Sequence, residues 1–440
     1  AKPDTFTYNT LIKYYSSDPH TLGEAERLLE QMIKLCKDKN EYCYPSGFSF
    51  ATIINAYARS NNSYSAKRAQ HILHRMVNLY KSGGHDVLKP DKVFYTSVIN
   101  AWANSGDPDA GSKSEKLLAE MHTLYDQGNE SMKPNIKSYN TVLLTHTRSG
   151  KDGINKAYEL LQSLECAEDK DINPNTVTYN MLIDAITPFN DEDGANLAQK
   201  MLYKMERRKR EGNNCAPDLT TYSLCIKAFS QCKAKYSATK AQCLFDHMIS
   251  TYESSGNQDI RPNWRVCTLV IDAWRRSNDT EKAIRAREML RLMIKYYEGG
   301  NTSIAPNLGT YNAVLLCCVH TNGAVQHKLA ALDIAYKSFQ ELVKSKYGNP
   351  NDVTYSTFLR ACNNLLPAGD ASRISIASAI FKRCCKDGQV SPDVIIEFKR
   401  AVPSETFKTF LGKNAERYGK MKNKINLQLL PKEWTCNLRT

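Results

Sequence analysis

The chain has 440 residues, and its 59 Lys and Arg against 46 Asp and Glu give it a formal net charge of +13. No stretch approaches the roughly 18 uncharged apolar residues of a membrane span, so we expect no transmembrane helix. The 14 cysteines include no Cys-x-x-Cys pair and no Cys/His cluster with zinc spacing, so we expect reduced packing residues and no metal site.

Prolines recur along the whole chain at intervals of 40 to 45 residues, namely Pro3, Pro45, Pro90, Pro134, Pro174, Pro217, Pro262, Pro306, Pro350 and Pro392. Self-similarity at a fixed period of about 20 to 50 residues is the sequence signature of a repeat solenoid. An aromatic ring follows most of these prolines five positions later, and Cys267 and Glu397 are the exceptions. We therefore expect one continuous body in which each repeat buries its apolar face on its neighbours.

Each repeat is predicted to begin with a helix just after the proline. In TVTYNMLIDAI, apolar side chains have the spacing of one buried helical face: Tyr179, Leu182, Ile183 and Ile186. A break rich in Gly, Asp, Asn and Ser then supplies a turn. A second helix follows with an Ala, a Leu-Leu-like pair and a Met, as in Ala198, Met201, Leu202 and Met205. The hydrophilic stretch before the next proline is expected to be a loop.

Such helix pairs predict an all-α fold, an α-solenoid of stacked antiparallel helix pairs. The expected repeats are 5–46, 47–91, 92–135, 136–175, 176–218, 219–263, 264–307, 308–351 and 352–393. Segment 394–440 is expected to be a degenerate repeat and a C-terminal cap, in which Phe398 packs into the core. The opening residues match the tail of a preceding repeat, so we expect the chain to be a piece of a longer protein.

The combined pattern, Pro-Asp/Asn-x-Val-Thr-Tyr-Asn-x-Leu-Ile followed by Ala-x-x-Leu-Leu-x-x-Met, resembles the pentatricopeptide repeat family over residues 3 to about 393. The array is similar to the P class of that family. Tetratricopeptide repeats carry a different Trp-Leu-Gly-Tyr pattern, and HEAT repeats lack the Tyr-Asn dipeptide. One departure is that these repeats are longer than is usual, with the excess between the second helix and the proline.

The resemblance implies a right-handed superhelix that binds single-stranded RNA, with one base read by two or three side chains of each repeat. The first reading position follows the aromatic ring: Asn9, Ala51, Thr96, Asn140, Asn180, Ser223, Thr268, Asn312 and Ser356. The second follows the next proline: Ser46, Asp91, Asn135, Asn175, Asp218, Asn263, Asn307, Asn351 and Asp393.

The family's code implies that Thr or Ser reads purines and that Asn reads pyrimidines. Adenine is expected at Thr96/Asn135, Ser223/Asn263 and Thr268/Asn307, and guanine at Ser356/Asp393. Uracil is expected at Asn180/Asp218, cytosine or uracil at Asn140/Asn175 and Asn312/Asn351, and a weakly held pyrimidine at Asn9/Ser46. Ala51/Asp91 departs from the code because alanine offers no hydrogen bond. The predicted target is 5′-YNAYUAAYG-3′.

The resemblance also implies residues that sandwich the bases three positions before the first reader: Phe6, Phe48, Val93, Lys137, Val177, Arg265 and Val353. Gly309 has no side chain for this purpose, so the eighth repeat is expected to bind loosely. Eight positions after the reader lie the candidate phosphate contacts Arg59, Arg148 and Arg276. The net charge of +13 favours a polyanionic partner.

Each signal also has a purely structural reading. A repeated Asn at a helix start is commonly an N-cap, although nine small polar residues in one register with a matched second set favour base reading. The arginines could equally be solvated surface residues. We find no zinc-deaminase signature, no two-metal aspartate cluster and no Gly-rich phosphate loop, so we expect neither enzyme activity nor a cofactor.

The sequence therefore predicts a sequence-specific RNA-binding protein that acts by occupancy in RNA stability, processing or translation. The resemblance implies a mitochondrial or plastid setting, with ribosomal or RNA-processing proteins as further partners. A second hypothesis is a solenoid scaffold that binds protein, for example in the structure or assembly of an organellar ribosome. A nuclease or editing domain beyond the visible ends is a third.

Overall fold

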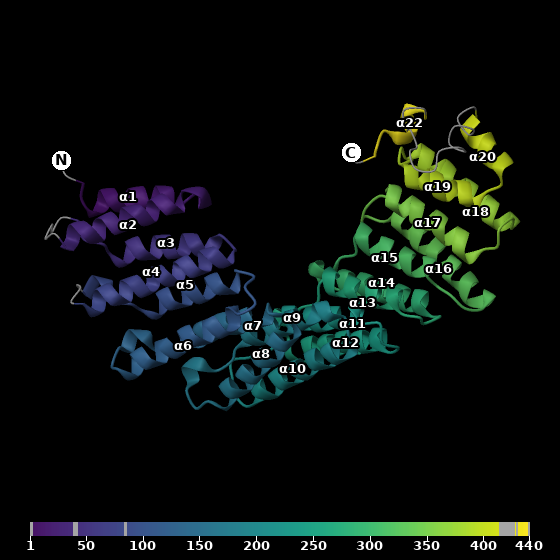
Figure 1. The fold of residues 1–440 in the computed structure, drawn as a ribbon. Coiled ribbons are helices and arrows are strands. Elements are labelled where there is room, and N and C mark those ends of the chain that lie inside the picture. Colours follow the sequence, from purple (N-terminus) through teal and green to yellow (C-terminus); the bar gives the residue numbers. More distant parts are fainter. Residues whose placement is uncertain (1–2, 38–42, 83–85, 413–426, 428–429, 439–440) are drawn as a thin grey trace. The chain divides into compact units, whose positions relative to one another are not determined.

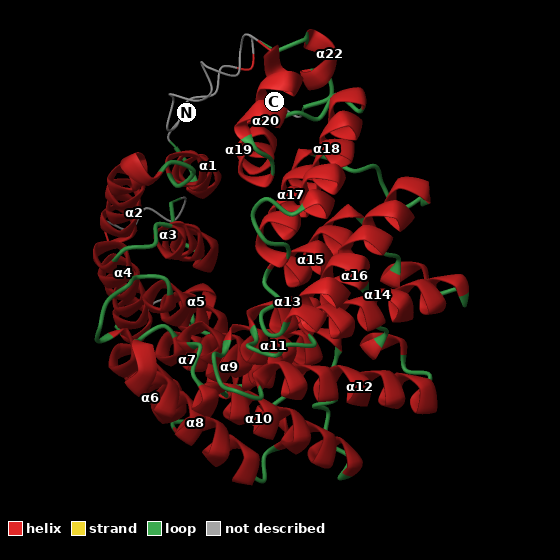
Figure 2. Ribbon diagram, turned by 90° about the vertical axis from the view of Figure 1, so that its right-hand side faces the viewer, coloured by secondary structure: helices red, strands yellow, loops and turns green. Residues whose placement is uncertain are grey.

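The computed structural model describes residues 3–37, 43–82, 86–412, 427 and 430–438. All regular structure in these residues is helical, and they contain no strand (Figure 2). The chain divides into two compact units: an N-terminal unit of Ala1–Ile186 and Tyr203–Ala216, and a C-terminal unit of Thr187–Leu202 and Pro217–Thr440. The two units are considered separately below.

The N-terminal unit is a stack of helix pairs (Figure 1). We call the first helix of each repeat helix A: α1 (Thr5–Tyr15), α3 (Gly47–Arg59), α5 (Lys92–Ala103), α7 (Ile136–Thr147) and α9 (Thr176–Ile186). The second helix, helix B, is α2 (Leu22–Lys37), α4 (Ser63–Lys81), α6 (Ala110–Asp126), α8 (Gly150–Cys166) and the second half of α10 (Glu192–Arg210). Through α7, each helix A packs against its own helix B and against the next helix A.

The C-terminal unit repeats this arrangement. Its A helices are α11 (Leu219–Gln231), α13 (Trp264–Arg276), α15 (Leu308–Val319), α17 (Asp352–Leu365) and α19 (Pro392–Ala401). Its B helices are the first half of α10, α12 (Ser237–Ser255), α14 (Lys282–Glu298), α16 (Val325–Lys344) and α18 (Ala371–Lys386). The short helices α20 (Ser404–Leu411) and α22 (Lys432–Thr435) follow.

The recurring aromatic ring of helix A belongs to the core. It is almost completely buried in six repeats, at Phe50, Tyr95, Tyr179, Tyr222, Tyr311 and Tyr355. The predicted helix-B positions are equally buried, and Ala198, Met201, Leu202 and Met205 are each at most 1% exposed. Burying an apolar side chain of this size is worth roughly 1.5 to 3 kcal/mol. The apolar residues that share one face of each helix therefore form the helix–helix contacts, as the sequence predicts.

The stretch before each proline contains more structure than the predicted loop. A single 3₁₀ turn lies there in five repeats: η2 (Asp86–Leu88), η3 (Glu130–Met132), η4 (Lys170–Ile172), η6 (Gln258–Ile260) and η7 (Thr302–Ile304). One buried apolar side chain often anchors the turn, as Met132 and Ile304 do. The turns and B helices of up to 20 residues account for the unusual repeat length.

The last described helices cover the end of the C-terminal unit. Phe398 occupies the position of a reader but is completely buried, and its ring stacks on Phe381 with centroids 4.0 Å apart. Trp434 of α22 meets the same Phe381 ring edge-on at 5.9 Å, and its carbonyl accepts a 2.8 Å hydrogen bond from the Val390 amide. The prediction that Phe398 packs is therefore confirmed. Residues 413–426, which carry much of the tail's basic charge, lie outside the described residues.

The predicted all-α solenoid of antiparallel helix pairs is confirmed by this arrangement. Among the described helices, none combines the length and the apolar character that crossing a membrane would require. The part of the chain that the structure describes also holds no cluster of three His, Cys, Asp or Glu side chains suited to a metal ion.

Candidate nucleic-acid interface

The second reading position is the N-cap of helix A in most repeats. The side-chain oxygen of Asn135 accepts a hydrogen bond from the Ser138 amide at 3.2 Å, and that of Asn263 accepts one from the Val266 amide at 3.1 Å. Asp91, Asn175, Asp218, Asn307 and Asn351 cap their helices in the same way. Such a cap stabilises a helix by about 1 kcal/mol. These residues therefore cap helix A, as the structural reading predicts, and any base contact would use their remaining polar atoms.

Asp393 departs from this pattern. Ser391 is the N-cap of α19, and its side-chain oxygen accepts a hydrogen bond from the Val394 backbone amide. Asp393 is therefore the second residue of the helix, and its side chain is exposed. Its predicted partner Ser356 is only 7% exposed and donates to the Val353 carbonyl at 3.1 Å. The structure therefore places the predicted guanine-reading pair differently from the others.

The first reading position lies one turn inside helix A. Its side chain is half-buried in the repeats other than that of Ser356: Asn9, Ala51, Thr96, Asn140, Asn180, Ser223, Thr268 and Asn312. The cap, the sandwich residue and the reader are the N-cap, second and fifth positions of one helix, as in Asn263, Arg265 and Thr268. Side chains three positions apart share one face of a helix. The N-terminal end of each such helix A thus carries the sandwich residue and the first reader of its own repeat, beside the cap that is the second reader of the preceding repeat.

The hydroxyl readers use their proton within their own helix. Thr96 donates to the Lys92 carbonyl at 2.6 Å, Ser223 to the Leu219 carbonyl at 2.6 Å and Thr268 to the Trp264 carbonyl at 2.8 Å. A hydroxyl has one proton and two lone pairs. Each of these readers consequently presents hydrogen-bond acceptors on the side that faces away from its helix.

The asparagine readers Asn9, Asn140 and Asn312 receive a hydrogen bond from the next repeat. The oxygen of Asn140 lies 2.8 Å from the Thr178 hydroxyl, and the oxygen of Asn312 lies 2.8 Å from the Thr354 hydroxyl. The oxygen of Asn9 similarly accepts from Ser49 at 2.6 Å. We did not predict this contact from the sequence. The signal was the recurring Ser or Thr immediately before the aromatic ring of helix A.

The predicted sandwich residues form an exposed series. The apolar members are Phe6 (78% exposed), Phe48 (55%), Val93 (62%), Val177 (60%) and Val353 (48%). Exposed apolar side chains at one fixed position of successive repeats cost solubility without contributing to the core. Lys137 and Arg265 are exposed at the same position, as is Gly309. Trp264, which we did not predict, lies beside Arg265, with the guanidinium 5.4 Å from its ring.

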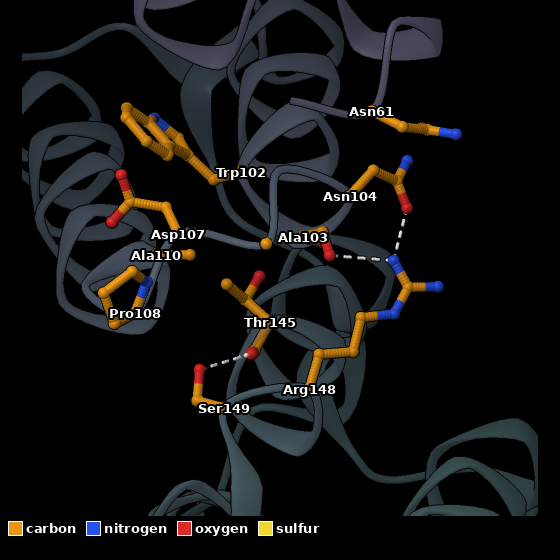
Figure 3. A pocket seen from close by; sticks show the side chains of 11 residues that line it. Asn61, Trp102, Ala103, Asn104, Asp107, Pro108, Ala110, Thr145, Arg148 and Ser149 are labelled. Atoms are coloured by element: carbon orange, nitrogen blue, oxygen red, sulfur yellow. Dashed lines mark hydrogen bonds between the residues drawn. The ribbon is translucent and has the colours of Figure 1, made fainter. Parts of the chain in front are cut away.

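The predicted phosphate contacts lie at the opposite end of helix A. Arg148 caps the C-terminus of α7 and lines a pocket of about 610 Å³ together with Trp102, Asn104 and Thr145 (Figure 3). Its guanidinium donates to the Ala103 carbonyl at 2.8 Å and to the side chain of Asn104.

The two other arginines have protein partners as well. Arg59 donates to the Ser16 carbonyl at 3.3 Å, which again belongs to the end of the preceding helix A. Arg276 pairs with Asp272 at 2.8 Å. Arg59 and Arg148 therefore connect neighbouring repeats, and Arg276 neutralises a carboxylate. Any phosphate contact would use their remaining N–H groups.

Comparison with known proteins gives an independent result. A profile of the pentatricopeptide repeat domain matches residues 123–188 and 160–231. The crystal structure of the pentatricopeptide repeat protein PPR10 from maize matches 95% of this chain with a TM-score of 0.51 and 17% sequence identity. The match covers 54% of the maize chain, so the present chain spans about half of its length. No curated protein matches the sequence. These matches confirm the resemblance read from the sequence.

Proposed function

We propose that this chain, as a pentatricopeptide repeat protein, binds single-stranded RNA. Each repeat would bind one base. The observation that carries the proposal is the recurrence of two unlike side chains on one helix face. An exposed apolar residue such as Val177 stands three positions before a half-buried polar residue such as Asn180 in successive repeats. A base needs both, since its ring stacks on apolar surface and its edge pairs with polar atoms.

The geometry of the readers supports the assignment of bases to repeats. Thr96 and Thr268 direct acceptors outward, which suits the exocyclic amino group of adenine. Asn140 and Asn312 hold their side-chain oxygen against the next repeat, which leaves the side-chain nitrogen to donate to a base oxygen. We propose the target 5′-YNAYUAAYG-3′, with the guanine least firmly assigned because Ser356 is buried.

The charge of the chain supports a nucleic-acid partner in general. A formal charge of +13 attracts a polyanion, and neutralising phosphates releases counterions. We propose that Arg59 and Arg148 contribute to this attraction, because their side chains are exposed at the ends of A helices. We propose that the chain acts by occupying its RNA target, without catalysis, and so protects, remodels or helps to process an RNA or controls its translation. The family resemblance is the reason for proposing a mitochondrion or plastid as the setting.

Fluorescence anisotropy tests the proposal directly. The chain is titrated into labelled 5′-CAACUAACG-3′, a scrambled RNA of the same composition and the matching single-stranded DNA, each at two salt concentrations. We expect the first RNA to bind most tightly, with each well-read base worth roughly 1 to 3 kcal/mol of discrimination. Equal binding to all three strands with a steep salt dependence would show a basic surface without base reading, and would favour the scaffold alternative.

A further inference from the structure

We infer that a third residue takes part in base selection: the hydroxyl at the third position of the following helix A fixes which polar group of an asparagine reader faces the base. This residue, which we call the lock residue, touches no base itself and acts by positioning its neighbour. The inference rests on the proposed function and adds a specificity determinant to the two reading positions.

The contact between Thr178 and Asn140 shows the arrangement. Thr178 is the third residue of α9, and its hydroxyl lies 2.8 Å from the side-chain oxygen of Asn140 on α7. The backbone N–H of Asn175 donates to the same hydroxyl at 3.2 Å, so one lone pair of the Thr178 oxygen is already in use. The alternative acceptor for the hydroxyl proton, the Asn175 side-chain oxygen, is farther away at 3.1 Å and already caps the helix. The proton of Thr178 is therefore directed at Asn140.

The same contact recurs in other repeats with an asparagine reader. Thr354 lies 2.8 Å from the Asn312 oxygen, and Ser49 lies 2.6 Å from the Asn9 oxygen. Both lock residues are fully buried, so water does not compete for the bond. Where the reader carries no amide, the lock position can lose its hydroxyl: Phe94 follows the Ala51 repeat, and Val266 follows the Ser223 repeat. A hydroxyl thus follows every asparagine reader, whereas the position after a reader without an amide holds either kind of side chain, as Thr310 and Val266 show.

An asparagine amide needs such a contact because its two ends are nearly the same size and have opposite polarity. The oxygen accepts hydrogen bonds and the nitrogen donates them. With the oxygen of Asn140 held by Thr178, the nitrogen is the group directed away from the neighbouring repeat, and the reader selects a base that offers an acceptor. Without the hydroxyl, the amide is free to turn, and a base that offers an amino group is accepted as well.

The test compares base discrimination at single positions. For the wild-type chain and for Thr178→Val, dissociation constants are measured on four RNAs that differ only in the fourth base, which Asn140 reads. We expect Thr178→Val to lower the preference for pyrimidine over purine at this base by about tenfold and to leave the third and seventh bases unaffected. Thr178→Ser keeps the hydroxyl and should keep the preference. Thr354→Val should act in the same way at the eighth base.

Thr310→Val provides a matched control. Thr310 makes the same capping contacts. Its backbone N–H donates to the side-chain oxygen of Asn307 at 3.0 Å, and the backbone N–H of Asn307 donates to the Thr310 hydroxyl at 3.5 Å. Its preceding reader is Thr268, which bonds to its own helix. Thr310→Val therefore removes the capping contribution alone and should not change the choice of the seventh base.

Two results would overturn the inference. One is that Thr178→Val keeps the wild-type preference at the fourth base although Asn140→Ala abolishes it. The other is that Thr310→Val lowers discrimination as much as Thr178→Val does, which would mean that only helix capping matters. If the wild-type chain shows no base preference at all, the proposed function fails. A crystal structure of Thr178→Val then decides the positioning separately, because an unchanged Asn140 side chain would show that Thr178 does not hold it.

Discussion

The phenol group of Tyr179 donates a hydrogen bond to the carboxylate of Glu165, which lies on helix B of the preceding repeat. The ring of Tyr179 is completely buried, and the Glu165 side chain is 7% exposed and also pairs with Lys204. Burial, followed by the adjacent carboxylate, raises the pKa of the Tyr179 phenol well above its usual value, so the hydroxyl remains a donor. One buried polar group thus joins three helices of the N-terminal unit.

Tyr179→Phe should lower the free energy of unfolding by about 1 to 2 kcal/mol, because it removes one bond to a charged, largely buried acceptor. The ring itself stays in the core, so no cavity forms. Urea titration followed by circular dichroism measures the change. Tyr236→Phe, at an exposed ring, is the control and should change stability by no more than about 0.5 kcal/mol. Equal effects of the two changes would mean that the Glu165 bond contributes nothing net.

Asp107 makes the N-terminal unit sensitive to acid. Its carboxylate accepts hydrogen bonds from Lys113 at 2.8 Å and from Ser63 at 2.6 Å, and these contacts lower its pKa to about 2. The pKa in the folded chain is below the unfolded value, so the contribution to stability is present above about pH 4 and is lost as the pH falls toward 2. Asp107→Asn should cost about 2 kcal/mol at neutral pH and almost nothing near pH 2.

The measurement is the urea midpoint of the first unfolding transition between pH 2 and pH 6. Asp126→Asn, at an exposed carboxylate, is the control for the loss of one negative charge from the surface of the same unit. A cost of Asp107→Asn that stays constant down to pH 2 would show that the side chain acts through shape and not through charge.

The buried cysteines should resist alkylation in the folded chain. Burial raises the pKa of the Cys362 thiol to about 12, and the thiolate is the reactive form. Cys166, Cys243 and Cys436 are exposed. Mass spectrometry after brief iodoacetamide treatment should find these three modified and Cys362 intact, whereas the denatured chain should be modified at all 14 cysteines. Modification of Cys362 as fast as Cys243 would indicate local opening of α17.

The sequence predicts the helices of this chain well because each helix start carries a local signal. The proline, the capping Asn or Asp and the buried ring of Tyr179 or Tyr311 all lie within one short segment. The contacts between repeats could not be predicted in the same way. The bond from Thr178 to Asn140, the ties from Arg148 to the end of α5 and the burial of Ser356 all depend on how closely neighbouring helices approach. A repeat length gives the register of these residues but not their distances.

A change of reader tests both the code and the lock residue. Thr96 is expected to read adenine, and Thr96→Asn should change the preferred third base from adenine to a pyrimidine. The neighbouring repeat already offers a hydroxyl, because Ser138 lies 3.2 Å from the Thr96 hydroxyl at the lock position. The new amide would therefore be oriented as that of Asn140 is. Dissociation constants for four RNAs that differ in the third base measure the change.

Ser223→Asn is the matched comparison, because the lock position of the following repeat is Val266, a buried side chain without a hydroxyl. We expect this variant to lose the preference for adenine at the sixth base without gaining a clear preference for pyrimidine, since nothing orients its amide. Combining it with Val266→Thr should restore selection of a pyrimidine by about tenfold. A complete change of preference in Ser223→Asn alone would show that the two reading positions suffice and that the hydroxyl of the next repeat only caps its helix.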